Sequence, residues 1–195
     1  MAPREITTIP PSLTRVSSSR AAEIETLLPV FAQAAREVEG PFVIPVPSAR
    51  LGFVRNVWSR AGGPEAEITD EAAWSVLQRV AVAAVCSGTA TLEAALARTP
   101  FVLAYRLSPA TVLETKLLRI KRPKFFGLPN IILDRLVVPE LLQDEASPAR
   151  IAAEMTRLRA GDLVQSEAFE ELDQLLGPAD AIARTAATAA EILNS

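Results

Sequence analysis

Short apolar runs alternate along the chain with stretches in which apolar residues recur at helical spacing. The segments 80–85 and 101–105 are apolar throughout, without the alternation of a half-exposed strand. We expect both to be central strands of a parallel sheet. The segment 42–46 also predicts a strand, made irregular by its prolines. Further short strands are expected at 13–16 and 66–68.

Helical patterns fill the spaces between these strands. A helix is expected after residue 20 and before Gly40-Pro41, and others over 51–60 and about 89–97. Ser108-Pro109 and Ser147-Pro148 each provide a cap followed by proline at the first helical position. The order of strands and helices predicts an α/β fold: a Rossmann-like parallel sheet with helices on both faces.

The chain of 195 residues is long enough for one domain with a substantial core. We expect residues 1–12, with three prolines, to be a flexible lead-in and 13–160 to form the α/β domain. Apolar positions at helical spacing over 161–195 predict C-terminal helices, packed on that domain or on a partner protomer. A third apolar segment, 131–133, follows Pro129-Asn130.

The composition excludes several kinds of chemistry. There is no histidine and only one cysteine. Without histidine a Ser-His-Asp or Cys-His hydrolase is excluded, and a zinc site would need carboxylates alone, so no metal is expected. A single cysteine excludes an internal disulfide framework and fits a reducing compartment. We therefore expect a cytoplasmic protein whose chemistry rests on carboxylates, cations, hydroxyls and backbone dipoles.

Charge and hydropathy exclude two further classes of protein. The chain has 20 basic and 23 acidic residues, a net charge of −3, which provides no electrostatic footprint for nucleic acid. The longest clean apolar run has about seven residues, far fewer than a membrane-spanning helix needs. The Pro-, Thr- and Ser-rich start lacks the pattern of a signal peptide.

The most informative segment is 87–93, which follows the strand 80–85 and opens a helix. A buried strand, a glycine turn and a helix N-terminus form the usual layout of an anion site. We expect it to meet the loops 17–20 and 105–106 at the carboxyl edge of the sheet, joined by the turn 127–130. These loops suit a diphosphate attached to a sugar. The candidate binding residues are Arg20, Ser87, Gly88, Thr89, Glu93, Tyr105, Arg106 and Asn130.

Each of these residues also has a purely structural interpretation. Ser87 and Thr89 are suited to capping the helix, and Glu93 near a helix N-terminus is favoured by the helix dipole alone. Surface arginines are commonly solvated, and Asn130 after a proline suits an ordinary turn.

A basic stretch between 116 and 124 has two interpretations as well. It forms either a solvated face or a contact with an anionic membrane surface, because apolar Leu117-Leu118 and Phe125-Phe126 lie beside it. The basic residues are Lys116, Arg119, Lys121, Arg122 and Lys124.

Taken together, the motifs resemble the C-terminal half of the lipid-A-disaccharide synthase family. They are Ser-Gly-Thr-Ala-Thr-Leu-Glu at 87–93, Pro100, Tyr105-Arg106, Leu-Pro-Asn at 128–130 and Val-Pro-Glu-Leu-Leu-Gln at 138–143. The resemblance implies half of a GT-B glycosyltransferase, inverting and independent of metal or other cofactors. Its reaction, in lipid A biosynthesis, moves 2,3-diacylglucosamine from UDP to lipid X and releases UDP.

The resemblance also assigns roles to the candidate residues. It implies that residues 87–89 hold the UDP diphosphate, that Glu93 holds the ribose, and that Tyr105, Arg106 and Asn130 line the donor pocket. The family's Leu-Pro-Gly-Ser-Arg turn corresponds here to residues 16–20, with Arg20 kept and Ser18 in place of a glycine. A Cβ at that position obstructs close approach of the backbone to a ligand.

Two functions remain open at this stage. The first is the donor-binding half of the enzyme, binding UDP or UDP-sugar but inactive alone, because the family supplies the acceptor site and the catalytic base from its other half. Its partner is then an acceptor-domain chain or a second copy, at the cytoplasmic side of the inner membrane. The alternative is a non-catalytic UDP-sugar-binding or scaffold domain derived from that family.

Overall fold

The computed structural model describes residues 21–86, 88–106 and 123–177. The first part contains α1 (Ala21–Ala35), β1 (Phe42–Pro45), α2 (Leu51–Arg60), β2 (Ala66–Thr69), α3 (Ala73–Arg79) and β3 (Ala83–Val85). The range 88–106 contains α4 (Thr89–Leu96) and β4 (Phe101–Tyr105). The range 123–177 contains α6 (Leu128–Ile132), β5 (Glu140–Leu142), α7 (Pro148–Arg159) and α8 (Leu163–Leu176). Short 3₁₀ helices at Ser48–Arg50 and Gln143–Glu145 precede α2 and follow β5.

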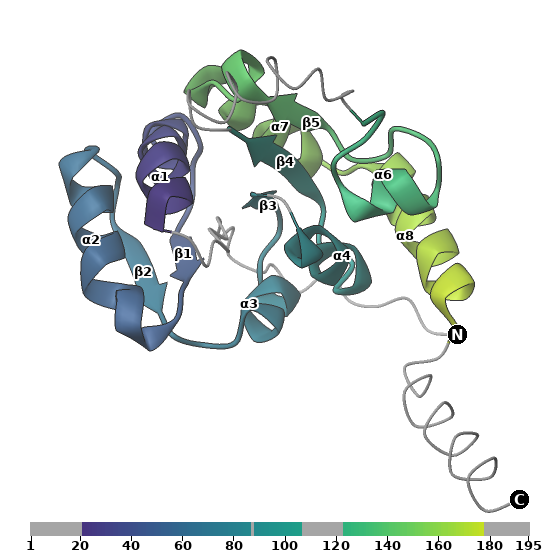
Figure 1. Cartoon of the computed structure of the whole chain (residues 1–195), viewed down its shortest axis with the longest axis horizontal. Helices are drawn as coiled ribbons and strands as arrows, with labels where there is room; N and C mark the ends of the chain where they lie inside the picture. The colour runs from purple at the N-terminus through teal and green to yellow at the C-terminus, as the bar shows by residue number, and fades with distance from the viewer. Residues whose placement is uncertain (1–20, 87, 107–122, 178–195) are drawn as a thin grey trace, which may run out of the picture.

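All strand pairs in the described chain are parallel, and they form two sheets (Figure 1). One sheet pairs β1 with β2, and the other has the order β3-β4-β5. In the second sheet, Val85 lies beside Leu103 and Tyr105 beside Leu142. The carboxyl ends of its strands therefore point to the same edge.

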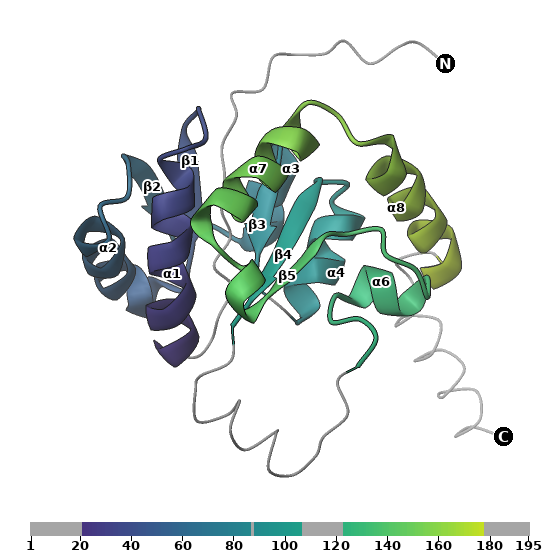
Figure 2. The ribbon, with the colours of Figure 1, turned by 90° about the horizontal axis from the view of Figure 1, so that it is seen from above.

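Helices cover both faces of the three-stranded sheet, with α7 over one face and α4 over the other (Figure 2). Successive side chains of a strand point to opposite faces, so Ala84 packs toward α1 and α7 while Val85 packs toward α4 and α8. The predicted α/β fold, a parallel arrangement with helices on both faces, is confirmed.

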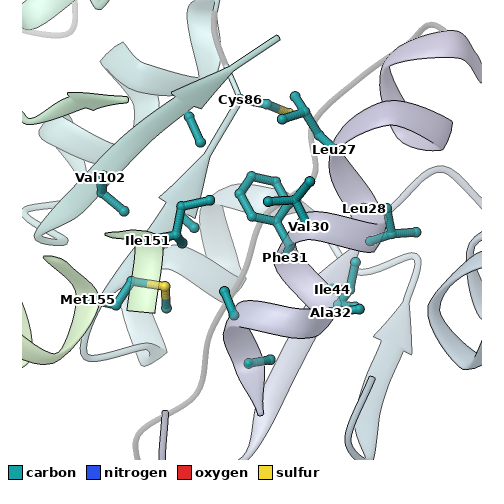
Figure 3. Packing of buried hydrophobic residues seen from close by; sticks show 14 of the residues in the cluster. Leu27, Leu28, Val30, Phe31, Ala32, Ile44, Cys86, Val102, Ile151 and Met155 are labelled. Atoms are coloured by element: carbon teal, nitrogen blue, oxygen red, sulfur yellow. The ribbon is translucent and has the colours of Figure 1, made fainter. Parts of the chain in front are cut away.

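The larger core joins the two sheets. Phe31 of α1 is fully buried between Ile44 of β1 and the α7 residues Ile151 and Met155 (Figure 3). Trp58 of α2 belongs to the same cluster. Burial of this continuous apolar set holds α1, α2 and both sheets in one domain.

Several elements differ from the sequence-based prediction. The strand expected over 80–85 is confined to Ala83–Val85. The apolar segment 131–133 lies at the end of α6, where Ile131 and Ile132 are exposed. The third strand of the sheet is instead β5, which follows Pro139 and is too short to show a periodic pattern. The strand predicted over 13–16 and the helix predicted from Ser108 lie outside the described residues.

The helix α8 packs on the same domain as the sheet. The rings of Phe169 and Phe101 are stacked with centroids 5.8 Å apart. Gln165 is fully buried, and its side chain both accepts from Phe101 N at 2.9 Å and donates to Phe101 O at 3.0 Å. Thus α8 is attached to the first residue of β4. The lead-in 1–12 and the tail beyond 177 lie outside the described residues.

Candidate functional site

Four segments meet at the carboxyl edge of the three-stranded sheet. Cys86 and residues 88–89 follow β3, Tyr105 ends β4 and is followed by Arg106, and 143–146 follow β5. The fourth segment, 126–128, enters α6 and is hydrogen-bonded to α4 through Leu128 N and Thr91 Oγ1, 3.1 Å apart. Open parallel sheets bind ligands in the crevice at this edge.

Gly88 forms the turn between β3 and α4 in a conformation reserved for glycine. Its φ of 77° and ψ of −157° lie in a region that side-chain-bearing residues enter only with strain. A Cβ built on Gly88 would have no atom within 4 Å, so the space above this turn is open. Both Gly88 and Thr89 are exposed. No side chain of the described residues caps α4, so the positive end of its dipole faces this space.

Thr91 connects the Gly88 turn to the start of α6. Its side chain is fully buried, and its hydroxyl donates to Gly88 O at 2.9 Å. The same oxygen accepts from Leu128 N. The Thr91 backbone N–H also donates to Gly88 O, at 3.1 Å. Two hydrogen bonds from Thr91 therefore fix the orientation of the Gly88 carbonyl.

Glu140, the first residue of β5, holds the segment before α6. Its carboxylate accepts from Phe126 N at 3.0 Å on each oxygen, from Gly127 N at 2.8 Å and from Asn130 Nδ2 at 2.8 Å. A Cβ on Gly127 would lie 3.4 Å from this carboxylate, so the carboxylate packs closely on the backbone of this segment. Three donors on one carboxylate fix the backbone of 126–127.

Asn130 is fully buried beneath the same loop. Its Nδ2 donates to Val138 O and Glu140 Oε1, and its Oδ1 accepts from Val137 N and Val138 N, each at 2.8 Å. These bonds use both amide hydrogens and both lone pairs of the oxygen. The side chain therefore organises the loop, and its role in lining the donor pocket stays a prediction. It lies within α6 rather than in a turn.

Tyr105 and Arg106 lie at the end of β4, both half-buried. Arg106 donates from Nε to Gln143 O at 3.2 Å and from Nη2 to Ala146 O at 2.9 Å. Gln143 itself has a φ of 54°, in the left-handed region. The Tyr105 and Phe126 rings have centroids 6.4 Å apart. These contacts hold the guanidinium over the end of β5 and place an aromatic pair at the end of β4.

The remaining candidates are placed in part. Glu93 is half-buried on α4, about one turn from Gly88. Arg20 and Ser87 lie outside the described residues, as does the basic stretch except for Lys124. Lys124 Nζ lies 2.7 Å from Asp134 Oδ1 and 4.8 Å from the centre of the Phe125 ring. Its charge and the neighbouring aromatic rings are therefore engaged within the domain.

Two features are absent from the described residues. No group of three or more Cys, Asp or Glu there is arranged to hold a metal ion. Across the same residues, no helix combines the length and the apolar character that crossing a membrane requires.

Solved structures with the same arrangement define the class of protein. The calicheamicin glycosyltransferase CalG4 matches with a TM-score of 0.59 and 21% identity, covering 93% of this chain and 44% of that chain. MurG of Acinetobacter baumannii matches with a TM-score of 0.52 and 16% identity, covering 89% and 50%. At these identities the likeness concerns the fold, which is that of half of a GT-B glycosyltransferase.

Sequence comparison narrows this class to one family. The family model of lipid-A-disaccharide synthetase matches residues 3–190, and the chain belongs to that family. It is 35% identical over 173 residues to the lipid-A-disaccharide synthase of Chromobacterium violaceum, covering 83% of this chain. It is 38% identical over 151 residues to that of Neisseria gonorrhoeae, covering 73%. The chain spans 44% and 38% of these relatives, less than half of each.

Three residues that hold this edge together received no role from the sequence. They are Thr91, Glu140 and Gln143, and all lie inside the motifs 87–93 and 138–143 that carry the family resemblance. Their position in those motifs was the available signal. Their partners are distant in sequence, so the pattern alone could not assign what they bind.

Proposed function

We propose that this chain is the donor-binding part of a UDP-sugar-dependent glycosyltransferase of the lipid-A-disaccharide synthase family. The observation that carries the proposal is the Gly88 turn. It presents the N-terminus of α4, which no side chain of the described residues caps, to open space at the carboxyl edge of the sheet. Arg106 lies at the same edge. A diphosphate is the ligand that this combination of helix dipole, backbone and guanidinium suits.

The site performs two tasks in the proposed reaction. The first is to hold the nucleotide, with the diphosphate at residues 87–89 and a ribose hydroxyl on the Glu93 carboxylate, one turn into α4. The second is to stabilise the charge that develops on the leaving UDP when the sugar is transferred. Donors fixed before the reaction are effective because they need no reorganisation as charge develops. Arg106 is fixed by two backbone carbonyls, and Arg20 is assigned the same task from the family resemblance.

The substrates follow from the family. We propose UDP-2,3-diacylglucosamine as donor and lipid X as acceptor. The general base that accepts the proton from the acceptor hydroxyl must lie within hydrogen-bond reach of it, and the family supplies this carboxylate from its other half. A protein of residues 1–195 alone is therefore expected to bind UDP without forming disaccharide. Its partner is an acceptor-domain chain or a second copy, at the cytoplasmic surface of the membrane that holds both lipids.

Calorimetric titration of the full chain with UDP, UMP and uridine tests the proposal. UDP is expected to bind more tightly than UMP, because its terminal phosphate meets the N-terminus of α4. Equal affinity for the three ligands would contradict the proposal that a diphosphate binds at the N-terminus of α4. Incubation with UDP-2,3-diacylglucosamine and lipid X tests the second expectation, since disaccharide formed by this chain alone would place the base among its own carboxylates.

A further inference from the structure

We infer that Glu140 and Thr91 are positioning residues for the donor site, acting on the Gly88 turn through the segment 126–128. The inference rests on the proposed function for the identity of the ligand, but the mechanical link is independent of it. Neither side chain has to touch the nucleotide. Together they determine the direction in which the start of α4 presents its N–H groups.

The link is continuous in hydrogen bonds from β5 to α4. The Glu140 carboxylate fixes Phe126 N and Gly127 N. The next residue, Leu128, donates its N–H to the Thr91 hydroxyl at 3.1 Å, and that hydroxyl donates to Gly88 O at 2.9 Å. A displacement of the 126–128 backbone therefore removes the donor to the Thr91 hydroxyl, which is then free to rotate away from Gly88 O.

Within the part of the chain that the structure describes, the Gly88 turn is held mainly by this support. A Cβ at Gly88 would meet no atom within 4 Å, so no packing surrounds the turn on that side. Its φ of 77° is one of several that glycine adopts with equal ease. A glycine with open space around it needs hydrogen bonds to select one conformation. Those recorded for its carbonyl come from the Thr91 N–H and the Thr91 hydroxyl.

The chemistry of the two residues fits this task. Thr91 is fully buried, so its hydroxyl oxygen is kept from water and used once as donor and once as acceptor. A carboxylate accepts several hydrogen bonds at once, and Glu140 uses both oxygens for three donors. Valine at 91 removes the hydroxyl with little change in shape, and alanine at 140 removes the carboxylate.

The experiment compares Thr91→Val, Thr91→Ser and Glu140→Ala with a control, Glu67→Gln. Glu67 is an exposed carboxylate on β2 that pairs with Arg79 at 3.2 Å, remote from the edge of the other sheet. For the wild type and each variant, the ratio of UDP to UMP affinity is measured by calorimetry. Amide hydrogen exchange of peptides covering 88–92 and 126–128 is measured without ligand.

Thr91→Val and Glu140→Ala are each expected to lower the UDP-to-UMP affinity ratio about tenfold, because misdirected N–H groups of α4 lose about one hydrogen bond to the terminal phosphate. Thr91→Ser, which keeps the hydroxyl, is expected to retain the wild-type ratio, as is Glu67→Gln. In Glu140→Ala, exchange is expected to rise in 88–92 as well as in 126–128. A residue with a merely structural role would lower the melting temperature and leave the ratio and the 88–92 exchange unchanged.

The outcomes separate this inference from the proposed function. If Glu140→Ala raises exchange only in 126–128, and the affinity ratio of the variants is that of the wild type, the positioning role is refuted while UDP binding stands. If the wild-type chain does not distinguish UDP from UMP, the proposed function fails, and the exchange measurement alone decides the link. If exchange in Glu140→Ala rises in both peptides, the link between 126–128 and the Gly88 turn is supported. If it rises in 126–128 alone, the link is refuted.

Discussion

Arg106 is held to the backbone of Gln143, the residue that follows the neighbouring strand β5 at the same edge of the sheet. Its Nε donates to Gln143 O at 3.2 Å, while Nη2 donates to Ala146 O at 2.9 Å. Gln143 adopts a φ of 54°, which turns the chain sharply after β5 and presents the carbonyl to the guanidinium. The planar fork of arginine matches two separate carbonyls in a way that an ammonium group cannot.

Replacing Arg106 with lysine is therefore expected to weaken UDP binding although the charge is kept. Loss of the fork releases the cation from its fixed position, and we expect about a tenfold loss of affinity, or roughly 1.4 kcal/mol. Calorimetric titration with UDP measures the effect. The matched control is Arg79→Lys, at an arginine paired with Glu67 and Glu71 far from this edge. Equal UDP affinities for the Arg106→Lys variant and the wild type would show that the guanidinium of Arg106 does not contribute to UDP binding.

A substitution at Gly88 is expected to cost binding through backbone conformation and not through a clash inside the protein. Alanine at φ 77° introduces strain of about 1–3 kcal/mol, relieved by a shift of the turn. We expect UDP affinity to fall at least tenfold in Gly88→Ala. Gly177→Ala is the control, because Gly177 has a φ of 73° with nothing within 4 Å of its Cβ position. A similar loss of stability in both variants, with loss of UDP binding only at position 88, is the expected result.

Glu93 is expected to recognise the ribose. Comparing UDP with 2′-deoxy-UDP and 3′-deoxy-UDP tests this in the wild type and in Glu93→Ala. The variant is expected to lose about 1–2 kcal/mol of UDP affinity, the value of a hydrogen bond to a charged group. Its affinity for one of the two deoxy ligands is expected to equal its affinity for UDP. A fall in melting temperature without a change in sugar preference would instead make Glu93 a structural residue of α4.

The stability of the domain is expected to depend strongly on Gln165. Its amide pairs with both Phe101 N and Phe101 O in a fully buried position. Gln165→Met keeps the length of the side chain but leaves two buried backbone groups unpaired, at a cost of about 1–3 kcal/mol for each. Denaturant unfolding measures the loss. The control Gln174→Met lies on the same helix at an exposed position and is expected to change little.

The ion pair between Arg135 and Glu171 is expected to give the domain a small dependence on pH. Hydrogen bonding to Arg135 lowers the pKa of the Glu171 carboxyl below its usual value of 4.5. A depressed pKa in the folded state stabilises the protein above the unfolded pKa, and this contribution is lost as pH falls through the folded pKa. The wild type is therefore expected to be more stable than Arg135→Gln at pH 7, and this difference is expected to disappear once the pH is below the folded pKa of Glu171. Both residues are exposed, so 1 M salt is expected to reduce it.

The sequence by itself determined the class of fold and most of its elements. Apolar runs predicted β1 and β4 within a residue of their observed ends, the sequence pattern predicted α2 and α4, and the Ser147-Pro148 cap predicted the start of α7. These patterns are local, since they record which face of a strand or helix is buried. The turn at Gly88 and the position of Arg106 at a strand end were likewise predicted, because parallel strands bring their carboxyl ends to one edge.

Only the tertiary structure decided how that edge is held together. Thr91 meets Leu128 across 37 positions of sequence, and Arg106 meets Ala146 across 40. Asn130 suited a turn that could face a ligand, yet the fold buries it and satisfies all of its polar atoms with Glu140 and the backbone of Val137 and Val138. Hydrogen-bond partners are chosen by proximity in space, which the packing of α6 against α4 and β5 creates. The sequence does not tell a buried asparagine from an exposed one, and only the packing of the chain decides whether the amide pairs within the protein.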